Sequence, residues 1–62
     1  MDIKCENGNT VSAWYLRPSR SWVVQLKDAN GNQIGSAEYS GCKETRDFDI
    51  KILVKQNGGV AP

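Results

Sequence analysis

The chain of 62 residues contains no histidine, and this absence limits the chemistry that it can support. Histidine is the side chain that most often serves as general base and metal ligand near neutral pH. A Cys-x-x-Cys pair and a glycine-rich phosphate loop are missing as well. We therefore expect a protein that is not an enzyme and that holds no metal and no cofactor.

Long apolar runs are also missing. No stretch approaches the ~18 consecutive apolar residues that would cross a membrane, and residues 1–5 do not have the form of a signal peptide. We expect no membrane partner and a cytoplasmic location. The alternative is a secreted protein whose signal peptide has been removed, and in that case we expect Cys5 and Cys42 to be bonded.

Cysteine is scarce, since Cys5 and Cys42 are the only two. A disulfide between them would close a long loop and stabilise the fold by on the order of 4 kcal/mol. That contribution would be large for a core that 62 residues can build. In a reducing cytosol the same residues would remain free thiols, and the sequence leaves both states open.

Excess charge of either sign is absent too: eight basic and seven acidic residues give a net charge of +1. This balance argues against a strongly basic nucleic-acid protein and against an acidic mimic of nucleic acid. Asp47 and Asp49 would share one face of a strand and could act as a pair. A solvated outer face balanced by Arg46 and Lys51 explains them more simply.

The stretch that organises the chain is 22–39, which reads as two strands around Asn30-Gly31. Asn-Gly between alternating apolar residues is the strongest short hairpin signal, because both residues tolerate a positive φ. A two-residue turn places Trp22 opposite Tyr39. The same face then carries Trp22, Val24, Leu26, Ala37 and Tyr39.

A second hairpin precedes it, with strands over 1–6 and 10–17 and a loop at 7–9. A three-residue loop places Cys5 opposite Val11. One face then carries Ile3, Cys5, Val11, Ala13 and Tyr15, and Trp14 points to the other face.

The last segment, 46–56, has two readings. Phe48, Ile50, Ile52 and Val54 alternate strictly with polar residues apart from Leu53, which is a strand period. A helix over about 43–56, stopped by Asn57-Gly58, is the alternative.

The preferred fold is therefore an all-β domain over 1–57. It is a small five-stranded antiparallel sheet, curled or partly closed as a barrel, built from two hairpins and a last strand. The alternative is an α+β fold, a four-stranded sheet with a C-terminal helix. Residues 58–62 are expected to form a flexible tail.

One region stands out as a candidate binding surface. Residues 7–27 contain no acidic residue but hold three cations and three large aromatic residues. Aromatic rings stack on nucleic-acid bases and basic side chains neutralise phosphates. Trp, Tyr and Arg are also the residues enriched in protein–protein hot spots. The candidate residues are Trp14, Tyr15, Arg17, Arg20, Trp22 and Lys27. Trp22 could instead pack in the core against Tyr39, and Trp14 could be either buried in the core or exposed.

These observations predict a small binding module that docks on, or inhibits, a larger protein partner through the aromatic and basic residues of 14–22. The first alternative is a small β-barrel that binds single-stranded nucleic acid. The second is a secreted, disulfide-bonded effector or ligand binder. Exposed strand edges would in addition allow homo-oligomers to form by strand pairing.

Overall fold

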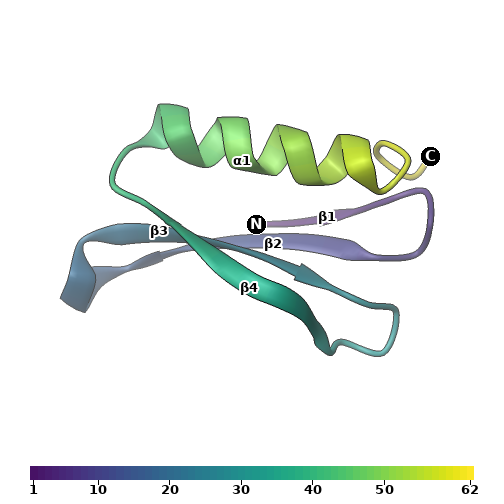
Figure 1. Ribbon diagram of the computed structural model, residues 1–62, viewed down its shortest axis with the longest axis horizontal. Helices are drawn as coiled ribbons and strands as arrows, with labels where there is room; N and C mark the ends of the chain where they lie inside the picture. Colours follow the sequence, from purple (N-terminus) through teal and green to yellow (C-terminus); the bar gives the residue numbers. More distant parts are fainter.

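The computed structural model describes all 62 residues and has two layers, a four-stranded antiparallel sheet and one helix on one of its faces (Figure 1). The strand order is β1-β2-β3-β4, so each strand pairs with its neighbour in the chain. The elements are β1 (Asp2–Lys4), β2 (Thr10–Leu16), a 3-10 turn (Arg17–Ser19), β3 (Ser21–Lys27), β4 (Gln33–Ser40) and α1 (Lys43–Gln56).

The predicted five-stranded all-β fold is wrong, because the segment predicted as the last strand is helix α1. The sheet is also not closed into a barrel, since β1 and β4 lie at its two ends. The α+β alternative, with a helix over 43–56, is the observed fold. The helix covers one face of the sheet and takes the place that barrel closure would have filled.

The alternating apolar residues of α1 divide between two sides of the helix. Ile50 points toward the sheet and is buried, with Leu53 and Val54 packed beside it. Phe48 and Ile52, one helical turn apart, are exposed. Spacings of three and four residues therefore define the buried stripe, and a strand period arises because residues from two helix faces alternate in the sequence.

The turn between β3 and β4 is longer than predicted. The Asp28 carboxylate accepts hydrogen bonds from the backbone N–H groups of Asn30 and Asn32, at 2.9 and 3.0 Å. Asp28 also pairs with Asn32 through its own N–H, so three residues separate the paired positions. A bulge follows, in which Gln25 alone faces residues 35–37 of β4.

These irregularities move β4 by one residue relative to the predicted register. Trp22 is opposite Ser40, and Tyr39 is opposite Val23. The predicted pairing of Trp22 with Tyr39 is therefore wrong. Since successive strand residues point to opposite faces, a slip of one residue places Tyr39 on the side of the sheet away from Trp22.

The first hairpin differs from its predicted register by two residues. Ile3 is opposite Val11, and the Cys5 N–H donates to the Asn9 carbonyl at 2.7 Å. The predicted opposition of Cys5 and Val11 is wrong. A register shift of two residues leaves each side chain on the same face of the sheet. The five residues predicted to share a face therefore still do so, namely Ile3, Cys5, Val11, Ala13 and Tyr15.

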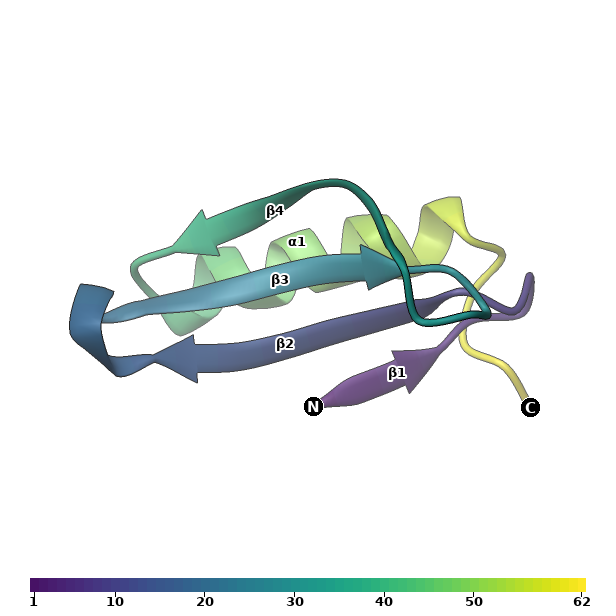
Figure 2. The same cartoon turned by 90° about the horizontal axis from the view of Figure 1, so that it is seen from below.

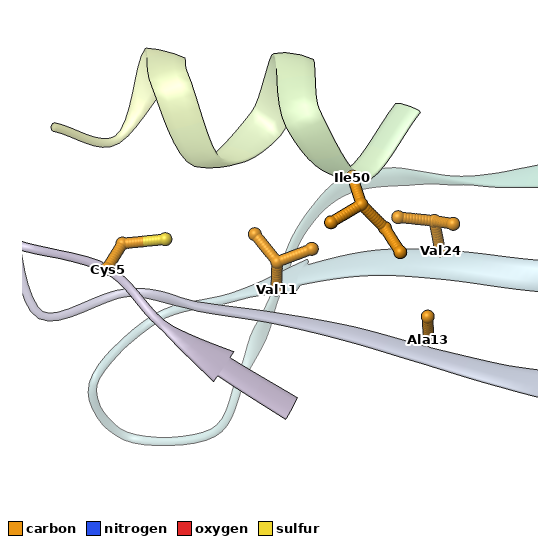
Figure 3. Packing of buried hydrophobic residues seen from close by; sticks show 5 residues of the cluster. All are labelled: Cys5, Val11, Ala13, Val24 and Ile50. Carbon is orange, nitrogen blue, oxygen red and sulfur yellow. The ribbon is translucent and has the colours of Figure 1, made fainter. Parts of the chain in front are cut away.

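The hydrophobic core lies between α1 and strands β1 to β3 (Figure 3). Its buried members are Cys5, Val11, Ala13, Val24 and Ile50. Partly buried apolar residues surround them, namely Ile3, Leu26, Leu53 and Val54. Cys5 is thus a core residue, whereas Cys42 is exposed at the start of α1; both are free thiols, so the disulfide considered from the sequence is not formed.

The residues predicted as a C-terminal tail return to the beginning of the chain. Val60 forms a bridge with Cys5. The Glu6 N–H donates to the Gly59 carbonyl at 2.9 Å, and the Ala61 N–H donates to the Lys4 carbonyl at 2.8 Å. These bonds continue the sheet beyond β1 by a short stretch of chain.

Candidate functional site

The face of the sheet opposite to α1 carries no covering element (Figure 2). We call it the open face. Its strand residues alternate with those of the core, and the register aligns them in rows across the sheet. The aligned residues are Asp2, Lys4, Thr10, Ser12, Trp14, Leu16, Ser21, Val23, Gln25, Lys27, Gln33 and Tyr39.

An aromatic row crosses the middle of the open face. Trp14 on β2 is opposite Val23 on β3, and Val23 is opposite Tyr39 on β4. Trp14 and Tyr39 are 39% and 65% exposed, whereas Val23 between them is only 3% exposed. Two strand spacings separate the aromatic positions, a distance of about 9–10 Å. The row thus offers two accessible rings on either side of a filled apolar centre.

Positive charge dominates the open face. Lys4 and Lys27 lie in one row at one end of the strands, and Asp2 is the only carboxylate on this face. Glu38, the one acidic residue within β4, is opposite the core residue Val24 and so points to the helix side. The remaining five acidic residues lie in turns or on α1.

Two further cations lie at the opposite end of the strands. Arg17 begins the 3-10 turn that follows β2, and Arg20 ends it in the left-handed conformation with φ 52°. Both are exposed, and neither forms an ion pair. Cationic side chains therefore lie on both sides of the aromatic row, toward the two ends of the strands.

Polar groups occupy the space between the lysine row and the aromatic row. The Gln25 side-chain amide donates to the Gln33 side-chain oxygen across β3 and β4. The Ser12 hydroxyl is buried and has no hydrogen-bond partner. A buried polar group without a partner costs free energy, so the Ser12 hydroxyl destabilises this part of the sheet.

The structure separates the residues that the sequence grouped into one surface. Trp14 and Lys27 lie on the open face, and Arg17 and Arg20 lie in the turn at its end. Tyr15 and Trp22 are opposite each other on the helix side of the sheet.

There the two rings pack edge to face, with centroids 5.3 Å apart. The Arg46 guanidinium lies 4.2 Å from the Trp22 ring centroid, and Arg46 also pairs with Asp47 at 2.7 Å. Tyr15 and Trp22 thus join the sheet to the start of α1, and they do not belong to the open face.

Sequence reasoning missed two residues of the open face, Tyr39 and Lys4. Tyr39 was assigned to the opposite face by the one-residue error in register. Lys4 lies outside the acid-free stretch 7–27 and joins the face only through pairing of β1 with β2. The side-chain carboxylate of Asp28, followed by Asn30 and Asn32, was the available signal for a longer turn.

Comparison with known proteins adds no relative: no family model, no curated protein and no solved structure matches the chain. No three His, Cys, Asp or Glu side chains come together as a metal-binding group. Helix α1 is neither long enough nor apolar enough to span a membrane. The functional argument therefore depends on the open face itself.

Proposed function

We propose that this protein is a non-catalytic binding module that takes single-stranded nucleic acid on the open face of its sheet. The observation that carries the proposal is the row with exposed Trp14 and Tyr39, on a face where lysine outnumbers carboxylate two to one. Single-strand binding surfaces combine aromatic rings, on which bases stack, with cations that follow the phosphates.

The two rings are spaced for separate bases. A flat base can stack on any aromatic face, and each such contact contributes about 1–3 kcal/mol. Val23 lies between the two ring positions and is almost fully covered, so the row has an apolar centre with an exposed ring on each side. Four-stranded sheets that bind RNA use paired aromatic residues on neighbouring strands in the same way.

The cations lie on both sides of such a strand, where they can contact its phosphates. Lys4 and Lys27 lie toward one end of the face and the Arg17–Arg20 turn toward the other. About three phosphate contacts would make the affinity fall roughly 20-fold between 50 and 200 mM salt, because counterions are released on binding. The open face would bind single strands in preference to a duplex, because the bases of a duplex are stacked on one another and cannot stack on Trp14 or Tyr39.

The test is fluorescence anisotropy with labelled 15-nucleotide oligo(dT) and oligo(U) at about 50 and 200 mM salt. Trp14→Ala and Tyr39→Ala should each weaken binding about tenfold or more. Phe48→Ala is the matched control, because Phe48 is an equally exposed aromatic residue on α1, away from the open face. Binding unaffected by Trp14→Ala and Tyr39→Ala would contradict the proposal.

A protein partner on the same face is the second candidate, and the buried Val23 between two exposed aromatic residues favours it. Binding hot spots have this composition, with large aromatic side chains around an apolar centre. Absence of oligonucleotide binding at 50 mM salt, where electrostatic attraction is strongest, would favour this candidate. Trp14→Ala should then abolish capture of the partner while circular dichroism shows an unchanged fold.

A further inference from the structure

A shallow groove of about 840 Å³, broadly open to solvent, lies between α1 and the β1 edge of the sheet, away from the open face. Its floor and sides are aliphatic, formed by Met1, Ile3, Ile50, Val54 and Val60. This volume lies within the range of small-molecule sites in proteins. From this groove we infer a second binding site, for a linear aliphatic carboxylate such as a medium-chain fatty acid.

The lining explains why an alkyl chain fits better than a peptide. No hydroxyl and no side-chain amide lines the groove, so its walls offer few partners for the polar groups of a peptide bond. Burying unpaired amides would cost free energy. An alkyl chain has no such groups, and each methylene buried against Ile3 and Ile50 would strengthen binding about fourfold.

The rim supplies the charge that the carboxylate needs. Lys51 and Lys55 are one helical turn apart on the side of α1 that borders the groove, and neither forms an ion pair. Asp47, the only acidic residue in the lining, is paired with Arg46 at 2.7 Å. Two unpaired lysines thus face the groove, and the one carboxylate in its lining is already paired.

One end of the groove has room for the chain. Gly59 lines it without a side chain, and a Cβ there would meet no atom within 4 Å, whereas the neighbouring Gly58 lies against Glu6. Figure 3 shows Ile50 pointing from α1 toward the sheet, with Cys5 and Val11 under the more C-terminal part of the helix. An alkyl chain lying along the groove would extend the apolar layer formed by these residues.

The test is a titration of the isotope-labelled protein with sodium decanoate below its micelle concentration, followed by methyl NMR. We expect saturable one-to-one shifts at Ile3, Ile50, Val54 and Val60, with the open face unchanged. Decanol, which lacks the charge, should bind more weakly. Shifts spread over the whole molecule, or equal affinity for both compounds, would overturn the inference.

Charge reversal at the rim gives the decisive comparison. The double variant Lys51→Glu, Lys55→Glu should weaken decanoate binding about tenfold, because two exposed charges that attract the carboxylate would repel it. Lys43→Glu, at the first residue of α1 and outside the groove, should change nothing.

Val60→Glu places a carboxylate at an exposed position of the groove and should also weaken binding. Unchanged affinity in the double variant would overturn the inference. So would saturation by the uncharged peptide acetyl-Leu-Val-Leu-amide without a response to decanoate.

Discussion

Asn7 and Asn57 are 50 positions apart in the chain, yet the Asn7 side-chain amide donates a 2.8 Å hydrogen bond to the Asn57 side-chain oxygen. Asn9 donates to the same oxygen at 2.9 Å, and Asn57 itself donates to the Leu53 carbonyl at 2.7 Å. Asn57 is only 7% exposed. One buried amide thus fastens the turn of the first hairpin to the end of α1.

Replacing the Asn57 side chain should destabilise the protein. We expect Asn57→Leu to lower the free energy of unfolding by about 2–3 kcal/mol, because Asn7 and Asn9 lose their shared acceptor. Urea denaturation would measure the change. Asn30→Ala is the control, since Asn30 uses only its backbone N–H at the hairpin tip; a similar loss in both variants would contradict the role of the Asn57 side chain.

A matched pair of isoleucines tests the helix. Ile50 is buried under α1 and Ile52 is exposed on it. We expect Ile50→Val to cost about 0.5–1.5 kcal/mol and Ile52→Val less than about 0.5 kcal/mol. Denaturant unfolding of both variants measures this difference. In a strand the two side chains would share a face, so equal losses would contradict the helix.

The two tryptophans should separate binding from stability. We expect Trp22→Ala to cost about 2 kcal/mol or more, because it removes the contacts with Tyr15 and Arg46. Trp14→Ala should reduce ligand binding while costing less stability. Thermal unfolding and anisotropy on the same two proteins provide the comparison, and the reverse pattern would place the binding surface on the helix side.

Glycine substitutions test the end of the helix. Gly58 has φ 92°, and a Cβ there would lie 3.2 Å from the Glu6 Cβ. We expect Gly58→Ala to destabilise the protein by about 1–2 kcal/mol from backbone strain and crowding. Gly41→Ala, where φ is not positive and no atom lies within 4 Å, should have little effect. Thermal melts of both would show whether this difference holds.

The thiols should differ in accessibility. Cys42 is exposed and Cys5 is buried, and neither is bonded. We expect a maleimide reagent to label the native protein once, at Cys42, and twice only after unfolding. Peptide mapping by mass spectrometry identifies the labelled residue. Rapid labelling of Cys5 in the native state would show that the first strand opens readily.

Local patterns predicted the first four strands, but the predicted fifth strand is helix α1, and the registers between the strands were wrong. The faces of the first hairpin followed from alternation, and they survived an error in register because that error was two residues. The predicted register of the second hairpin was wrong by one residue. The turn held by the Asp28 side chain and the bulge at Gln25 place extra residues between the paired positions of β3 and β4. Turn chemistry that depends on side-chain hydrogen bonds is harder to read than the Asn-Gly pair alone.

The helix shows a different limit. Its apolar residues fit a strand as well as a helix, and the choice is made by the uncovered apolar face of the sheet, which needs an opposing layer. The candidate binding residues also divide into those indicated by local sequence and those that depend on strand pairing. Arg17 and Arg20 were found from the acid-free stretch, whereas Tyr39 and Lys4 reach the open face only through strand pairing.

The pairing of residues 59–61 with residues 4–6 has a consequence for biosynthesis. Residues 4–6 leave the ribosome before residues 59–61, so the outer edge of β1 remains unpaired until more than fifty further residues have been made. Asn57, whose side chain binds the first turn, is also synthesised long after that turn. A nascent chain can therefore form its hairpins early, but it cannot close its core until almost all of this sequence has been translated.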